Sequence, residues 1–135
     1  MDINKALTLS ARGMSVQTAR LRTIAENLAN QDTTGSQPGA EPYRRKVISF
    51  ENRLDRALGA EVVRVKSIAT AKGDLPQRFD PSHPAADGKG YVLTPNVNSF
   101  VEVMDMREAQ RAYSANLNVM EVTRSMLTRT LEMLK

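Results

Sequence analysis

Apolar residues recur at intervals of seven at both ends of this 135-residue chain, and this spacing constrains the fold more than any other feature. The two series are Leu7, Met14, Leu21 and Leu28 near the N-terminus and Ala112, Val119, Met126 and Met133 near the C-terminus. Such spacing places side chains along one side of an α-helix, where they can pack against other helices. The segment between them is rich in Pro and Gly. The pattern predicts a protein that assembles through its terminal helices rather than an enzyme.

The N-terminal series predicts a helix that begins at a capping Asp2 or Asn4 and continues to about Asn30. Ile24 widens its apolar face. The other faces carry Ser, Thr, Asn and Gln instead of paired Glu and Lys, so few side-chain pairs support the helix. We therefore expect this helix to be weakly stable alone and to become ordered on assembly.

The C-terminal segment has neither Gly nor Pro after its capping Asn96 or Asn98 and is predicted to be helical to Lys135. Val122 is grouped with the first series. Beside that series runs a second apolar stripe, formed by Tyr113, Met120, Leu127 and Leu134. Two stripes make a wide apolar face, which is typical of a helix packed on two sides in a bundle or tube. The alternative is that the stripes only pack the two helices on each other in a monomeric hairpin.

The middle of the chain has short stretches of strand character separated by turns. We predict strands over 43–50 and 62–69, a helical turn over 51–58 that ends at Gly59, and weaker extended pieces at 77–79 and 91–93. The predicted fold is mainly α with a small β insertion, its long terminal helices packing as a coiled-coil-like pair. The predicted divisions are 1–35 for the N-terminal helix, 36–96 for the β-rich element and 97–135 for the C-terminal helix.

Composition and charge narrow the classes of function. Only 4% of the residues are aromatic, so the core available to one chain is thin and oligomerisation is the natural way to cover the helices. The net charge of +4 includes no basic arm, and the only tight cluster, Arg44, Arg45 and Lys46, continues into a predicted strand; we predict no nucleic-acid binding. No apolar run is long enough for a membrane span or a secretory signal, so we expect any export to proceed without a cleaved signal peptide.

The residues offer no site for catalysis, a cofactor or a metal ion. The chain has no Cys, and its single histidine, His83, lies in a predicted turn between Ser82 and Pro84; a Ser/His/Asp triad remains only a formal possibility. Residues 88–90 do not complete a phosphate-binding loop. Asp80 and Asp87 lack the alternating ligands of a calcium loop and are interpreted as turn formers.

Residues 10–35 read SARGMSVQTARLRTIAENLANQDTTG, which resembles the N-terminal signature of bacterial flagellar basal-body rod proteins, a family that also includes hook subunits. The motif at its end consists of Asn27, Leu28, Asn30, Thr33, Thr34 and Gly35. The stretches PYRRK at 42–46, DPSHPAADGKGYV at 80–92 and PNVN at 95–98 resemble the proximal-rod branch of that family. Residues 36–42, inserted where many rod proteins continue directly, also suit this branch.

The resemblance implies a structural subunit of the proximal rod that passes unfolded through the flagellar type III export apparatus, assembles helically in the periplasm and transmits motor torque. Its partners would be copies of itself and other rod proteins. The expected subunit interface consists of Leu7, Met14, Leu21, Ile24, Leu28, Ala112, Val119, Val122, Met126 and Met133. The motif at 27–35 would shape the end of the first helix; recognition by the export machinery is the alternative role. A soluble adaptor or partner of the export system is the alternative function.

Overall fold

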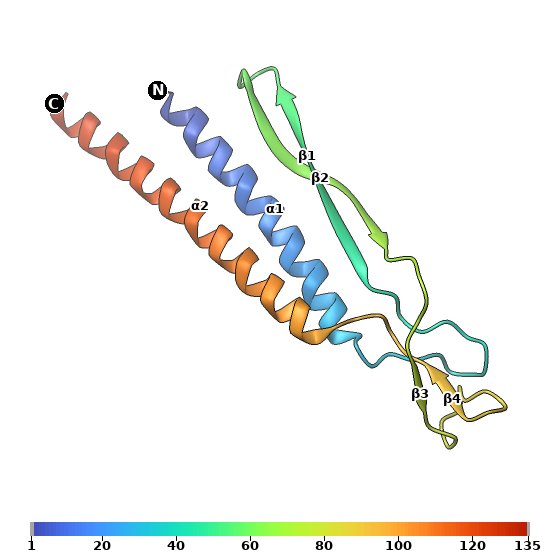
Figure 1. The fold of residues 1–135 in the computed structure, drawn as a ribbon. Helices are drawn as coiled ribbons and strands as arrows, with labels where there is room; N and C mark the ends of the chain where they lie inside the picture. Colours follow the sequence, from blue (N-terminus) through green and yellow to red (C-terminus); the bar gives the residue numbers. More distant parts are fainter. Residues whose placement is uncertain (1, 135) are drawn as a thin grey trace. The chain divides into compact units, whose positions relative to one another are not determined.

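A computed structural model describes residues 2–134, which form two helices and four strands (Figure 1). The order along the chain is α1 (Ile3–Ala29), β1 (Lys46–Asp55), β2 (Ala60–Thr70), β3 (Gln77–Phe79), β4 (Tyr91–Leu93) and α2 (Ser99–Met133). The chain divides into two compact units. Unit 1 contains the chain up to Leu21, Ile48–Ser67 and the chain from Met106, whereas unit 2 contains Arg22–Val47 and Ile68–Asp105.

Both helices begin at side-chain caps, as the sequence predicts. Asp2 Oδ1 accepts the backbone N–H of Asn4 at 3.0 Å, so Asp2 is the cap of α1. Asn98 Oδ1 accepts the N–H groups of Phe100 and Val101 at 3.0 and 3.3 Å, so Asn98 rather than Asn96 is the cap of α2. These bonds satisfy amide groups that a helix N-terminus otherwise leaves without acceptors.

In unit 1, α1 and α2 run antiparallel and approach closely at Gly13 (Figure 1). A Cβ atom at Gly13 would lie 2.8 Å from Asn116 Nδ2, so only glycine allows this approach without a shift of the amide. Farther along, Arg20 Nη2 lies 3.7 Å from Glu108 Oε2. The buried apolar side chains of this unit are few and small: Val16, Val62 and Ala109.

Strands β1 and β2 pair in a two-stranded sheet connected by a tight turn (Figure 1). The predicted helical turn over 51–58 is wrong, because β1 continues to Asp55 and the chain turns only at 56–59. Pairing with β2 overrides the weak strand propensity of residues 51–55. Asp55 Oδ1 accepts the N–H groups of Ala57 and Leu58, and Gly59 closes the turn at a φ of 59°.

The start of the predicted 43–50 strand also differs, because β1 begins at Lys46. Tyr43 donates its N–H to the carbonyl of Thr33 instead of to a neighbouring strand. Strand β2, and the weaker pieces β3 and β4, lie where the sequence predicts them.

In unit 2, β3 and β4 form an antiparallel pair in which Arg78 lies opposite Val92. Val92 is fully buried, while the rings of Phe79 and Tyr91 meet edge to face with their centroids 5.3 Å apart. Asp87 organises the connecting loop, because its Oδ1 accepts the N–H groups of Tyr91 and Lys89. These bonds lower the pKa of Asp87, the one from Tyr91 contributing most. Its interpretation as a turn former is confirmed.

The mainly α fold with a small β insertion is confirmed. Over the described residues, neither helix contains a stretch long and apolar enough to cross a membrane. The largest fully buried side chains in the described chain are Glu102, Val92 and Asn27, two of which are polar. The core of unit 2 is therefore centred on hydrogen bonds as much as on apolar contacts.

Candidate functional site

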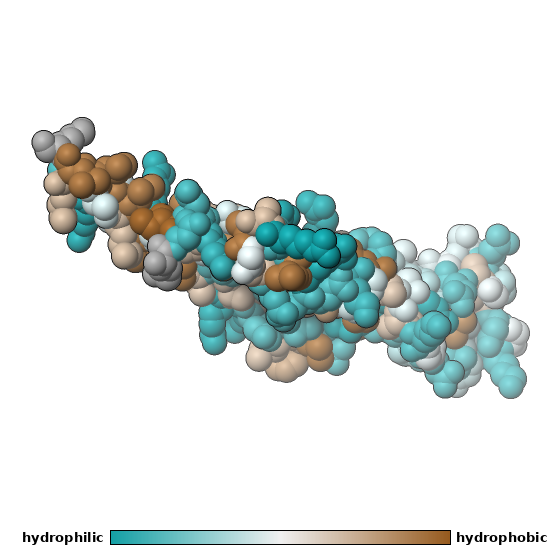
Figure 2. Space-filling model, turned by 90° about the horizontal axis from the view of Figure 1, so that it is seen from above, coloured by the Kyte–Doolittle hydropathy of each residue, from teal (hydrophilic) through white to brown (hydrophobic). Residues whose placement is uncertain are grey.

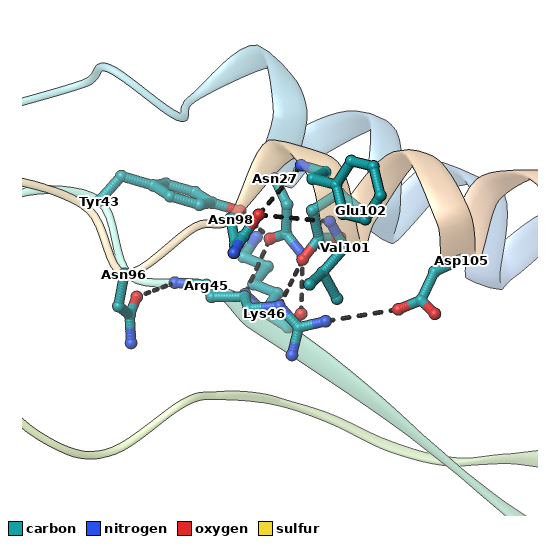
Figure 3. Close-up of polar contacts among 10 residues, drawn as sticks. Asn27, Tyr43, Arg45, Lys46, Asn96, Asn98, Val101, Glu102 and Asp105 are labelled. Carbon is teal, nitrogen blue, oxygen red and sulfur yellow. Dashed lines mark hydrogen bonds and ion pairs between the residues drawn. The ribbon is translucent and has the colours of Figure 1, made fainter.

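The most concentrated set of polar contacts lies in unit 2, where the end of α1, the start of β1 and the start of α2 meet (Figure 3). We call Asn27, Tyr43, Arg45, Lys46 and Glu102 the polar clamp. Asn27 comes from the last turns of α1, and Glu102 comes from the first turn of α2. The other three precede or begin β1.

Asn27 is the centre of the polar clamp and is only 1% exposed. Its Oδ1 accepts the backbone N–H of Lys46 and the hydroxyl of Tyr43, each at 2.8 Å. Its Nδ2 donates to the carbonyl of Lys46 at 2.9 Å and to Glu102 Oε2 at 3.3 Å. An asparagine amide has two acceptor and two donor positions, and all four are used here. The amide thus replaces a neighbouring strand for Lys46 and fastens β1 to α1.

Glu102 is fully buried, and its carboxylate is neutralised by Arg45. Arg45 Nε donates to Glu102 Oε1, and Arg45 Nη2 lies 3.6 Å from Asp105 Oδ2 one turn farther along α2. A carboxylate in the first turn also interacts favourably with the helix dipole. Burial of a charge is costly unless it is paired and hydrogen-bonded, and Glu102 meets both conditions.

Two further contacts hold the rim of the polar clamp. Lys46 Nζ pairs with Glu26 Oε1, and the backbone N–H of Arg45 donates to Asn96 Oδ1 at 2.7 Å. The hydrogen bond to Glu26 raises the pKa of Lys46. Burial raises the pKa of Tyr43, and the nearby carboxylate of Glu26 adds to that effect. Both shifts favour the protonated forms that make these contacts.

The chemistry of the polar clamp is that of a structural joint. Its central donors and acceptors are already bonded to one another, so none is directed at a vacant position where a substrate or ion would sit. Among residues 2–134 there is no group of three His, Asp or Glu side chains arranged to hold a metal ion. Arg44, the third member of the basic cluster, pairs with Glu41, so each of the three cations of that cluster has a carboxylate partner.

The motif residues that follow Asn27 shape the end of α1. Asn30 Nδ2 donates to the carbonyl of Glu26, while Asn30 Oδ1 accepts the Thr33 hydroxyl at 3.1 Å. A Cβ at Gly35 would lie 2.7 Å from the Ala40 carbonyl oxygen, so the chain folds back closely there. Leu28, the remaining apolar member of the motif, is half-buried.

Thr34 and His83 connect this turn to the loop before β4. Thr34 Oγ1 lies 3.0 Å from His83 Nε2, and His83 Nδ1 accepts the backbone N–H of Ala85. The second bond requires Nδ1 without a proton, so the neutral ring donates to Thr34 through Nε2. His83 is therefore a loop residue, as predicted, and it also connects two loops through its contact with Thr34.

The predicted interface residues differ in burial. On α1, Ile24 is buried, while Leu7, Met14, Leu21 and Leu28 are half-buried. On α2, Ala112 is half-buried, but Val119, Val122, Met126 and Met133 are 51–84% exposed. Of the second stripe, Tyr113, Met120 and Leu127 are half-buried and Leu134 is 79% exposed. Met120 lies with Leu7 and Ala11 around a shallow apolar pocket in unit 1.

Sequence reasoning missed Glu102, Arg45 and Asn96 as members of one site. Glu102 resembles any acidic residue in the first turn of a helix, and no local pattern pairs it with a residue 57 positions earlier. The only signal was indirect: the PYRRK and PNVN stretches contain Arg45 and Asn96, and both stretches belong to the resemblance noted above.

Comparison with known proteins agrees with that resemblance. The family profile "Flagella basal body rod protein" matches residues 7–37, and the profile "Flagellar basal body rod FlgEFG protein C-terminal" matches residues 89–133. The flagellar basal-body rod protein FlgC of Agrobacterium fabrum is 45% identical over 98% of this chain and 96% of its own length. The FlgC proteins of Aquifex aeolicus and Salmonella typhimurium are 39% and 33% identical, each over at least 97% of both chains.

Proposed function

This chain belongs to the FlgC family of flagellar basal-body rod proteins, and on that premise we propose that it is a structural subunit of the proximal rod. It assembles helically with copies of itself and other rod proteins and transmits motor torque. The observation that carries this proposal is the uncovered apolar side of α2.

Four large apolar side chains lie on that side, and each is at least half exposed in the described chain. Val119 and Met126 are each 51% exposed, Val122 is 60% exposed and Met133 is 84% exposed. Hydrophobic side chains also gather over the C-terminal end of α2, at the left of the view in Figure 2. Soluble monomers rarely expose a continuous apolar surface of this kind, whereas subunits of assemblies cover it with neighbours.

The half-buried residues of α1 provide the complementary surface. We propose that Leu7, Met14 and Leu21 flank the packed helices and receive apolar side chains from adjacent subunits in a coiled-coil-like arrangement. The ten residues proposed for the subunit interface are Leu7, Met14, Leu21, Ile24, Leu28, Ala112, Val119, Val122, Met126 and Met133. The two methionines of α2 in this set, Met126 and Met133, adapt the surface to neighbours that are not identical.

The polar clamp gives the subunit a rigid joint. Within unit 2, its direct hydrogen bonds fix the start of β1 to the end of α1 and the start of α2, which supports a force-transmitting role for this part of the subunit. The motif at 27–35 has the same role, because its bonds fold the chain back toward β1. This favours a structural role of the motif over recognition by the export machinery.

Export in an unfolded state, through the flagellar type III apparatus and without cleavage of a signal peptide, also belongs to this proposal. The small number of large buried apolar side chains supports it, because a thin core gives low stability to a single chain and makes unfolding easy. The assembled subunit then gains its stability in the periplasmic rod, where neighbours cover the exposed residues.

The test is substitution on the two helices in a motile host whose own subunit is replaced. Leu21→Asp and Met126→Asp are expected to abolish swimming and stop rod growth, while the protein is still exported, because a buried charge at a subunit interface is costly. Ser125→Asp, beside Met126 on an exposed position of α2, is the matched control for charge. Normal swimming of both interface variants would refute the proposal.

Cell fractionation separates this role from that of a soluble adaptor of the export system. A rod subunit is expected in purified basal bodies at a fixed ratio to other rod proteins. An adaptor would instead remain in the cytoplasm and be absent from those particles.

A further inference from the structure

A second surface, in unit 1, is chemically unlike the helices and is not used by the rod interface described above. A cavity of about 330 Å³ lies between α1 and the β1–β2 pair, within that unit. Four arginines line it: Arg12 from α1, Arg53 from β1, Arg56 from the turn and Arg64 from β2. We call these four residues the arginine cleft.

Most of the positive charge in the arginine cleft is not neutralised within the chain. Arg64 Nη2 lies 2.6 Å from Glu51 Oε1 and is paired. Within residues 2–134, the side chains of Arg12, Arg53 and Arg56 make no hydrogen bond or ion pair. The four guanidinium groups carry four positive charges, and the carboxylates of Glu51 and Asp55 carry two negative charges. The arginine cleft therefore has an excess of two positive charges.

The carboxylate of Asp55 lines the cavity but has another role. Its Oδ1 accepts two backbone N–H groups of the β1–β2 turn and thereby fixes that turn. Because the β1–β2 turn is fixed, the backbone position from which Arg56 extends is fixed as well. The arginines are therefore presented by an ordered turn and two paired strands.

The shape and composition of the arginine cleft favour a protein carboxylate as the ligand. A guanidinium binds a carboxylate through two parallel N–H···O bonds. A bound anion also reduces the electrostatic repulsion between neighbouring arginines. Val62 and Val63 line the same cavity, and Leu54 on its rim is 59% exposed, so the methylene groups of an acidic side chain also find apolar contacts. The carboxylates of Glu51 and Asp55 oppose a ligand as highly charged as a polyphosphate.

We propose that the arginine cleft binds an Asp- or Glu-bearing segment of a neighbouring rod subunit. This inference rests on the proposed function, because assembly into the rod is what brings another subunit against unit 1. It adds a charged contact, on the β1–β2 side, to the apolar contacts of the helices. Charged contacts of this kind select the correct neighbour and its register, since like charges at the same place are strongly unfavourable.

The first experiment replaces the charges in the motile host. The double variant Arg53→Glu/Arg56→Glu is expected to lower the number of completed rods about tenfold or more, because repulsion then replaces attraction at the interface. Arg53→Lys/Arg56→Lys retains the charge and is expected to have a milder effect. Arg78→Glu, an exposed arginine on β3 outside the cleft, is the matched control. Normal rod numbers in the double Glu variant would overturn the inference.

A second experiment does not depend on the folding of charge variants. A photo-crosslinking benzoylphenylalanine replaces Leu54 on the rim, and the crosslinked peptides from purified basal bodies are identified by mass spectrometry. Peptides of another subunit that contain Asp or Glu close to the crosslink are expected. Crosslinks only to segments without carboxylates would overturn the inference while leaving the rod assignment intact. Absence of the wild-type chain from the basal bodies would instead refute the proposed function.

Discussion

Replacement of Glu102 by alanine removes the buried centre of the polar clamp. Arg45 then loses a charged partner, and one Nδ2 hydrogen of Asn27 loses its acceptor. A hydrogen bond to a charged group contributes about 1.5–3 kcal/mol, and removal of one partner of a buried ion pair costs about 3–5 kcal/mol. The side chain of Arg45 is 28% exposed and also approaches Asp105, so the guanidinium keeps part of its stabilisation.

We therefore expect Glu102→Ala to lower the free energy of unfolding by about 2–4 kcal/mol. Glu102→Gln retains the size and one acceptor, and is expected to cost about half as much. The measurement is urea unfolding of the purified full chain, followed by circular dichroism at constant pH and salt. Amide hydrogen exchange assigns the loss to unit 2, where protection of β1 near Lys46 is expected to fall.

A double-mutant cycle between Glu102→Gln and Arg45→Met isolates the pair. Because the two side chains are in direct contact, a coupling free energy of about 1–3 kcal/mol is expected. A second cycle, between substitutions of Glu102 and Arg78, is the control, because Arg78 belongs to a different ion pair. The two free-energy changes of the control cycle are expected to be additive. A coupling for Glu102 and Arg45 no larger than that of the control would refute the role given to the polar clamp.

Three other changes test separate parts of the structure. Gly13→Ala is expected to destabilise unit 1, because its Cβ would meet Asn116 Nδ2, although alanine favours helix. In an Asn116→Ala background the same substitution should instead stabilise the protein by up to about 1 kcal/mol. Urea unfolding measures both effects. The raised pKa values of Tyr43 and Lys46 add stability that is complete below about pH 10 and is lost at higher pH; a wild-type stability curve without a decline above pH 10 would contradict this. The lowered pKa of Asp87 adds stability that is present above about pH 4 and is lost as pH falls further, so Asp87→Asn should flatten the acid limb of that curve.

The helices and most strands could be predicted from the sequence because their signals are local. A seven-residue apolar period, an Asp or Asn cap and the absence of Gly and Pro define α1 and α2 nearly to the residue. Residues 51–55 were predicted wrongly as a helical turn because they carry weak strand signals, and only pairing with β2 makes them extend β1. Non-local pairing of this kind leaves no mark in a short window.

The polar clamp was hidden for a similar reason. The family motif pointed to Asn27, but its role depends on a carboxylate that lies 75 residues later in the chain. The sequence likewise showed two apolar stripes on α2 without revealing which of them meets α1. The structure shows that Met120, of the second stripe, lies beside Leu7, and that Val119 and Met126 of the first stripe are exposed.

The most direct test of the structural role is electron cryo-microscopy of basal bodies purified from the source bacterium, with mass spectrometry of the same particles. Density for this chain is expected in the rod, next to the membrane-embedded ring, with Val119, Val122, Met126 and Met133 buried against neighbouring subunits. Intact basal bodies that lack the chain, or a rod in which these four side chains remain in solvent, would contradict that role.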